Sequence, residues 1–169
     1  FGIFKFFLGV NKKNKDEIKI YTNLGFMKIQ TKKKNSINQK MFKNLLKSKI
    51  VIGTAQFGSQ YGINNNNKKI SNLEIKKIKN YAIKNCINSF ETAQSYGDAE
   101  SKLGILNMKN FLVITKLQGL NQEYDQKKIY ALIKDSLKKL RIKQIYGLMI
   151  HNTKDLQGAN GLKMFNFLE

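Results

Sequence analysis

Residues 87–104 contain the residue types that carry proton-transfer chemistry. Glu91 stands five residues before Tyr96, and a carboxyl group and a phenol can both serve as general acids or bases. The apolar run before Glu91 and the Gly97-Asp98 turn after Tyr96 predict a loop between a strand and a helix. Because catalytic groups concentrate on loops that a rigid scaffold holds, this loop is the first candidate for an active site.

The elements that must position this loop alternate between two patterns from residue 49 onward. Four continuous apolar runs predict strands at residues 50–54, 87–90, 111–115 and 145–150. Apolar residues at helical spacing predict helices at residues 71–85, 98–106 and 126–140. At the start of the first helix, Ser71 and Glu74 form a capping box, and Ile75, Ile78, Tyr81 and Ala82 mark its apolar face. The alternation favours α/β units and a parallel sheet.

Polar residues follow each of the four apolar runs at its C-terminal end, and Tyr96 lies in the loop beyond the second run. The four residues are Thr54, Glu91, Lys116 and His151. This edge carries the active site in a (β/α)8 barrel and the ligand crevice in an open α/β sheet. Periodicity alone does not distinguish the two architectures, because only four units are present.

The stretch around Tyr96 resembles the signature of the aldo/keto reductase family, which reads roughly G-x-N-x-F-D-T-A-x-x-Y-G-x-S-E-x-x-L-G. Glu91 replaces the family's aspartate. Residues 53–58 and 113–116 look like the ends of the family's first and third strands, and residues 136–140 followed by 148–152 look like the end of its fourth unit. The resemblance runs from about residue 49 to residue 155. It implies a TIM barrel, of which this chain would hold the first half, about four βα units.

The resemblance also implies roles for the polar residues. Aldo/keto reductases transfer hydride from a nicotinamide, usually NADPH, to a carbonyl group. Tyr96 would donate the proton, Lys116 would stabilise the phenolate, and His151 would orient the substrate carbonyl. Glu91 would pair with Lys116, and its extra methylene leaves two readings, a working variant of the tetrad or weakened reductase chemistry. A satisfied structural role is the alternative for His151.

Two residues at the end of the first strand would contact the cofactor. The resemblance assigns this contact to Gly53 and Thr54, although Thr54 equally fits a strand-end cap. NADP is the expected cofactor, with NAD as the alternative, and no metal site is expected. The implied substrate is a small carbonyl compound or alcohol.

The N-terminal residues have a different pattern. Residues 4–31 resemble the C-terminal end of a GCN5-related N-acetyltransferase through Asn14, Tyr21 and Leu24-Gly25-Phe26. The expected elements form a short βαβ-like segment, with strands at residues 4–10 and 26–31 and a helix at residues 16–24. The resemblance would make Tyr21 a general acid, but no acetyltransferase activity is expected because the upstream coenzyme loop is absent.

These patterns divide the chain into three parts. Residues 1–31 are assigned to an acetyltransferase remnant, residues 32–48 to a basic linker with a short helix at 41–47, and residues 49–169 to a truncated aldo/keto reductase domain. The chain begins with Phe1 and ends abruptly at Glu169. We therefore expect a fragment of a longer protein that is inactive by itself.

The net charge of +20 raises nucleic acid or an anionic membrane as a partner. Arg141 is the only arginine, the lysines are scattered, and no aromatic-interleaved basic motif is present, so we expect no specific nucleic-acid partner and no membrane. The single cysteine, Cys86, excludes an internal disulfide and favours the cytoplasm. The alternative classes are a non-enzymatic protein, either truncated or association-dependent, and non-specific nucleic-acid binding through excess lysine. The oligomeric state is not predicted.

Overall fold

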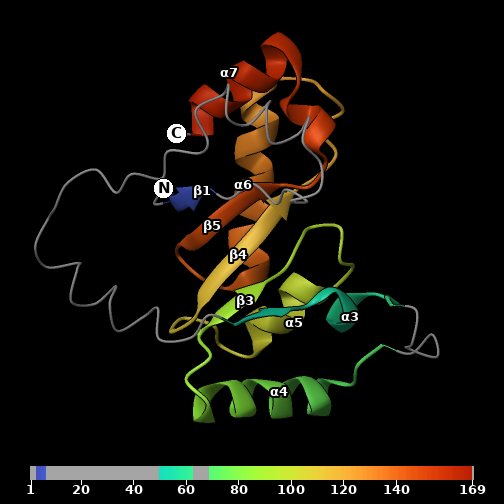
Figure 1. Cartoon of the computed structure of the whole chain (residues 1–169), viewed down its shortest axis with the longest axis vertical. Helices are drawn as coiled ribbons and strands as arrows, with labels where there is room; N and C mark the ends of the chain where they lie inside the picture. Colours follow the sequence, from blue (N-terminus) through green and yellow to red (C-terminus); the bar gives the residue numbers. More distant parts are fainter. Residues whose placement is uncertain (1–2, 7–49, 63–68, 169) are drawn as a thin grey trace, which may run out of the picture.

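The computed structural model describes residues 3–6, 50–62 and 69–168, and these residues contain a parallel β-sheet with helices (Figure 1). The sheet is five-stranded, with the order β1-β5-β4-β3-β2. Its strands are β1 (Ile3–Phe6), β2 (Val51–Gly53), β3 (Ser89–Glu91), β4 (Leu112–Leu117) and β5 (Ile145–Ile150). The expected parallel α/β sheet is confirmed, because β2 to β5 lie side by side in chain order and pair in parallel.

Helices connect successive strands. They are α3 (Ala55–Gly58), α4 (Asn72–Lys84), α5 (Ala99–Ile105) and α6 (Gln126–Leu140), followed after β5 by the 3-10 helix η1 (Thr153–Leu156) and α7 (Gly158–Leu168). Figure 1 shows α6 behind β4 and β5, with α4 at the end of the molecule opposite α7. The arrangement is that of a partial (β/α)8 barrel.

Helix α6 and strand β5 occupy the residues that the apolar spacing predicts. Helix α6 begins after Asp125, whose carboxylate accepts hydrogen bonds from the backbone amides of Lys127 and Lys128. It ends at Arg141, which adopts a left-handed backbone with φ of 53°. The apolar spacing predicts the helix, and a defined cap at each end fixes its bounds.

Strands β3 and β4 are displaced from their predicted positions toward the C-terminus. Both extend into polar residues, because Glu91 pairs in register with Ile114, and Lys116 with Met149. Ladder hydrogen bonds use backbone groups and therefore continue past the last apolar side chain. As a result, Glu91 and Lys116 lie inside strand ends, where the backbone is held on both sides, and do not follow the strands as predicted.

Helix α4 only partly follows its predicted pattern. The Ser71 hydroxyl accepts a hydrogen bond from the Glu74 amide at 3.2 Å, which confirms half of the capping box. The Glu74 carboxylate forms an ion pair with Lys77 at 3.2 Å. The prediction for Tyr81 was wrong, since its side chain is 64% exposed while Ala82 is fully buried.

Three elements were not predicted: α3, η1 and α7. At the N-terminus, the predicted strand at residues 4–10 corresponds in part to β1, which pairs in parallel with β5. The other N-terminal elements, at residues 16–24, 26–31 and 41–47, lie outside the described residues, as does the linker.

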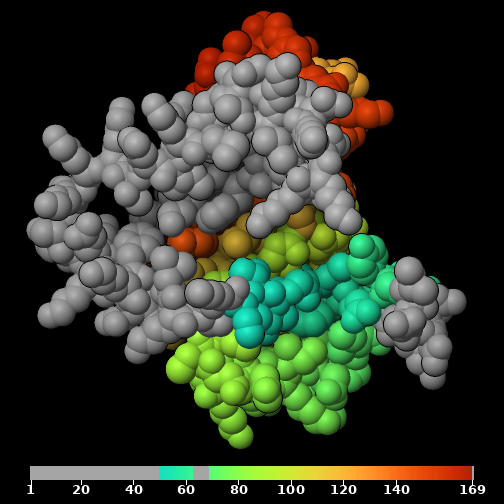
Figure 2. Space-filling view, in the orientation of Figure 1, coloured from blue at the N-terminus to red at the C-terminus, as the bar shows by residue number. Residues whose placement is uncertain are grey.

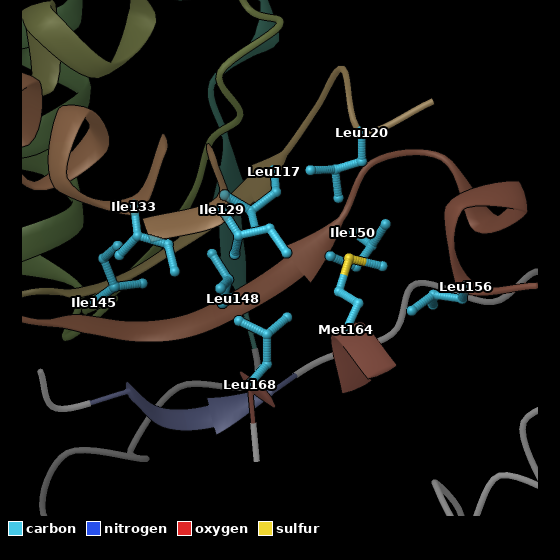
Figure 3. Close-up of a cluster of buried hydrophobic side chains, with 10 residues drawn as sticks. All are labelled: Leu117, Leu120, Ile129, Ile133, Ile145, Leu148, Ile150, Leu156, Met164 and Leu168. Atoms are coloured by element: carbon cyan, nitrogen blue, oxygen red, sulfur yellow. The ribbon is translucent and has the colours of Figure 1, made fainter. Parts of the chain in front are cut away.

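Two apolar clusters stabilise the described part of the fold. The first packs β4 and β5 against α6, η1 and α7 (Figure 3), and consists of Leu117, Leu120, Ile129, Ile133, Ile145, Leu148, Ile150, Leu156, Met164 and Leu168. The second lies between α4, α5 and the sheet, and contains Ile75, Ala82, Phe90, Leu103 and Val113. Burying a large aliphatic side chain contributes roughly 1.5–3 kcal/mol, so these clusters hold the strand ends firmly.

Strand β2 forms one edge of the sheet and is open on one side among the described residues. Figure 2 shows the residues of β2 and α3 at the surface on this face of the molecule. Val51 is 48% exposed and Ile50 is 57% exposed. No helix within residues 50–62 and 69–168 has the length and apolar character needed to cross a bilayer.

Candidate active site

Tyr96, in the loop after β3, meets Lys116 near the C-terminal end of β4. The ammonium group of Lys116 donates a hydrogen bond to the Tyr96 hydroxyl, with 2.7 Å between Nζ and Oη. The same nitrogen lies 4.5 Å from the centroid of the Tyr96 ring. A cation this close to the phenol oxygen stabilises a phenolate more than a neutral phenol.

Glu91 completes this group from the last residue of β3. Its Oε1 forms an ion pair with Lys116 Nζ, and the two side chains are only 24% and 14% exposed. Partial exclusion of water strengthens the attraction between the charges. The extra methylene of Glu91, relative to aspartate, therefore does not prevent the pairing that the sequence predicted.

His151 lies at the same edge, directly after β5. Its backbone amide donates to the Leu117 carbonyl at 2.8 Å. Its ring lies 6.2 Å from the Tyr96 ring between centroids, at an interplanar angle of 80°. On its other side, Nδ1 is 3.2 Å from the Ser95 hydroxyl. The structure thus brings all four predicted residues, Glu91, Tyr96, Lys116 and His151, to one place.

Burial dominates the protonation behaviour of the site. Burial lowers the pKa of Lys116 to about 8, although the nearby Glu91 carboxylate favours the charged form. Burial, and then Tyr61, raise the pKa of Tyr96 above 10.0. Burial, followed by the charge of Lys116, lowers the pKa of His151 below 6.5. Near neutral pH, Tyr96 is therefore a protonated phenol and His151 a mainly neutral imidazole.

Gln94 anchors the loop that carries Tyr96, and sequence reasoning missed it. Its side-chain amide nitrogen donates to the Leu132 carbonyl at 2.8 Å and to the Ser136 hydroxyl at 2.9 Å, and its Oε1 accepts from the Gln118 amide at 3.2 Å. Its own backbone amide donates to the Lys116 carbonyl at 3.3 Å. No local signal marks this residue, because the partners of its side chain lie 24 to 42 residues away.

Two glycines allow α3 to approach the same loop. A Cβ placed on Gly58 would lie 1.7 Å from the Tyr96 carbonyl oxygen. A Cβ on Gly97 would lie 2.4 Å from the Gly58 carbonyl oxygen, and Gly97 has a φ of 57°. The backbones therefore pack closely where α3 meets the start of α5, and this contact limits movement of Tyr96.

Gly53 and Thr54 end β2 beside this group. Gly53 is exposed, and a Cβ there would lie 3.7 Å from Glu91 Oε2. The Thr54 amide donates to the Glu91 carbonyl at 3.0 Å. Thr54 precedes α3, and its side chain makes no hydrogen bond that caps this helix. Its hydroxyl is buried without a hydrogen-bond partner among the described residues.

Residues 50–62 and 69–168 contain no group of three or more His, Cys, Asp or Glu side chains that could hold a metal ion.

The fold of this chain is similar to that of solved structures. Two candidate aldo-keto reductases from Pseudomonas aeruginosa match with TM-scores of 0.56 and 0.53, at 19% and 18% identity. Each match covers 70% of this chain and 49% or 48% of the other chain. The chain thus spans about half the length of these structures. A comparison with curated protein sequences gave no match.

A comparison with protein families gives the assignment. The model of the aldo/keto reductase family matches residues 49–157, which is more than half of the chain and includes all four site residues. Residues 1–31 lie outside this match, so their acetyltransferase resemblance stays a prediction. Because the family model matches more than half of the chain, the chain belongs to the aldo/keto reductase family, a family of oxidoreductases.

Proposed function

We propose that the protein containing this chain is an NAD(P)H-dependent carbonyl reductase in which Tyr96 donates the proton. The observation that carries the proposal is the contact between the Lys116 ammonium and the Tyr96 hydroxyl, at 2.7 Å. Glu91 pairs with the same ammonium. An acid whose conjugate base is stabilised in advance by a fixed cation is suited to protonating a developing alkoxide.

The raised pKa of Tyr96 is compatible with this role. Burial keeps the phenol protonated at neutral pH, so the proton is available before the reaction begins. An alkoxide is a stronger base than a phenolate, so transfer of the proton from Tyr96 to the alkoxide is favourable. Lys116 then stabilises the phenolate through the hydrogen bond that it already makes.

Of the two readings of Glu91, the ion pair with Lys116 supports a working variant of the tetrad. A carboxylate beside the ammonium keeps more of Lys116 charged than burial alone would allow. The charge of Lys116 is the property that the proton donor requires. Glu91 therefore acts through Lys116, without needing to reach the substrate.

The nicotinamide cofactor would supply the hydride that reduces the carbonyl carbon. The end of β2 fits a bound cofactor, because Gly53 is exposed beside the site and the Thr54 hydroxyl has no partner among the described residues. We propose NADP, with NAD as the alternative, and a small carbonyl compound as substrate. Residues beyond the half of the fold seen here would bind the rest of the cofactor. This fragment by itself would then be inactive, and a cytoplasmic location suits its single cysteine.

The test is NADPH oxidation by the complete protein with a panel of small aldehydes and ketones. Replacing Tyr96 with phenylalanine should reduce kcat by about 10²–10⁴-fold, because it removes only the proton donor. The matched control is Tyr81→Phe on the exposed face of α4, which should retain wild-type turnover. Full turnover by Tyr96→Phe would refute the role of Tyr96.

A second candidate function is association with another polypeptide, and one observation favours it. Strand β2 is the sheet edge, and Val51 is 48% exposed there. Open edge strands pair readily with other chains. Saturable NADPH binding by the chain as a monomer, measured by calorimetry and sedimentation, would exclude this candidate.

Non-specific binding of nucleic acid through the lysine excess would show as weak affinity that is lost at physiological salt.

A further inference from the structure

His151 and Ser95 form a hydrogen-bonded pair that bridges two strand ends. The Ser95 hydroxyl lies 3.2 Å from His151 Nδ1, although the residues are 56 positions apart. Their backbones are held independently. The His151 amide donates to Leu117 at 2.8 Å, and the Gln94 amide, next to Ser95, donates to Lys116 at 3.3 Å. The pair is therefore set by the fold and not by a local turn.

The state of the imidazole makes the direction of this hydrogen bond important. Burial and the charge of Lys116 lower the pKa of His151, so the ring is mainly neutral near pH 7. A neutral imidazole has one N–H donor and one acceptor nitrogen, and the partner of one nitrogen decides the role of the other. Because the serine hydroxyl can rotate, it can donate to an unprotonated Nδ1 or accept from a protonated one.

Only one of these two directions suits a carbonyl substrate. A carbonyl oxygen accepts hydrogen bonds, so the imidazole must present a protonated nitrogen to it. Nδ1 is occupied by Ser95, which leaves Nε2 as the nitrogen available to a ligand. If Nδ1 carried the proton, Nε2 would present a lone pair to the carbonyl oxygen and repel it.

We propose that Ser95 is a positioning residue that donates its hydroxyl proton to Nδ1 of His151 and so holds the ring in the tautomer protonated on Nε2. The Nε2–H group then donates to the oxygen of a carbonyl compound. The tautomer is a property of this chain by itself, whereas its use in orienting a carbonyl rests on the proposed reductase function. Ser95 itself does not touch the substrate.

Nuclear magnetic resonance tests the tautomer directly, because His151 is the only histidine in the chain. In the ¹⁵N-labelled full chain, long-range ¹H–¹⁵N correlation distinguishes the protonated ring nitrogen from the unprotonated one. We expect the wild-type ring to be protonated on Nε2. In Ser95→Ala, the Nδ1-protonated tautomer should become populated and the pKa of His151 should rise, since a hydrogen bond that favours the neutral ring is lost.

Two further variants make the test specific. Ser95→Thr retains a hydroxyl at the same position and should restore both the wild-type tautomer and the wild-type pKa. Ser101→Ala removes a serine hydroxyl from α5, away from the ring, and should change neither. A wild-type ring protonated on Nδ1, or a Ser95→Ala ring with unchanged tautomer and pKa, would overturn the proposal.

Failure of the Ser95 proposal and failure of the reductase proposal give different results. If the tautomer responds to Ser95 but the complete protein reduces no carbonyl compound with NADPH or NADH, the role of Ser95 stands and the reaction is wrong. If the complete protein is active but the tautomer does not respond, the reaction stands and Ser95 is not the positioning residue.

Discussion

Lys116 and Tyr96 are 20 residues apart and leave different strands, yet the Lys116 ammonium donates directly to the Tyr96 hydroxyl at 2.7 Å. The contact exists because β3 and β4 are adjacent and parallel, so that their C-terminal ends lie at one edge of the sheet. The same pairing places Glu91 beside Lys116. The contacts among Glu91, Tyr96 and Lys116, and those that hold the Tyr96 loop, lead to predictions on protonation and stability.

Protonation of Lys116 should make the stability of the chain depend on pH between about 8 and 10.5. Its folded-state pKa of about 8 is below the ordinary value of 10.5. In this window the unfolded chain binds more protons than the folded chain, so the contribution of Lys116 to the free energy of unfolding rises with pH. Urea unfolding should show a larger rise over this pH range in the wild type than in Lys116→Met.

The control for this experiment is Lys77→Met, which removes an exposed lysine and should keep the wild-type pH dependence. If the free energy of unfolding depended on pH in the same way in wild type and Lys116→Met, the pKa of Lys116 would not be lowered by folding.

Removing the Glu91 charge should lower the pKa of Lys116 further. Glu91→Gln keeps the side-chain length but loses the carboxylate that favours the ammonium form, so burial acts unopposed. Competitive acetylation followed by mass spectrometry measures the reactivity of the peptide containing Lys116 as a function of pH. The reactive, neutral amine should appear at lower pH in Glu91→Gln.

Glu74→Gln is the matched variant, because it removes an exposed carboxylate that pairs with Lys77. Glu74→Gln should leave the pH dependence of Lys116 acetylation unchanged. A Glu91→Gln profile that coincides with wild type would argue against electrostatic coupling between Glu91 and Lys116.

Loss of the Gln94 side chain should destabilise the loop that carries Tyr96. Gln94→Ala leaves the hydroxyl of the buried Ser136 and the Leu132 carbonyl without this partner. An unsatisfied buried polar group costs about 1–3 kcal/mol, and we expect a loss of that size in chemical denaturation. Gln118→Ala should cost much less, because residue 118 contributes only its backbone amide. Equal losses in the two variants would contradict the anchoring role.

A methyl group at Gly58 should disturb the site through a backbone clash. The added Cβ would lie 1.7 Å from the Tyr96 carbonyl oxygen, so α3 and the Tyr96 loop must separate. Overpacking of this kind costs about 1–3 kcal/mol or more. Thermal unfolding should show a larger loss for Gly58→Ala than for Gly119→Ala, whose Cβ meets nothing within 4 Å and whose cost comes from its φ of 69°. The opposite ranking would contradict the close contact.

The elements that sequence predicts well are those whose signals are local. Helix α6 has a cap at Asp125 and a continuous apolar face, and strand β5 is an unbroken apolar run, so both were located at their observed residues. The predicted bounds of β3 and β4 were less accurate. Backbone pairing with a neighbouring strand extends β3 to Glu91 and β4 past Lys116, and no single strand carries that information.

The sequence by itself determined the family, the alternation of strands β2 to β5 with helices α4 to α6, and the identities of Glu91, Tyr96, Lys116 and His151, because motifs and periodicity are properties of neighbouring residues. Tertiary structure decided the rest. The Gln94 anchors, the approach of Gly58 to Tyr96 and the pairing of Ser95 with His151 join segments that are far apart in the chain. Such contacts depend on strand register and helix packing, which arise only when the whole sheet forms.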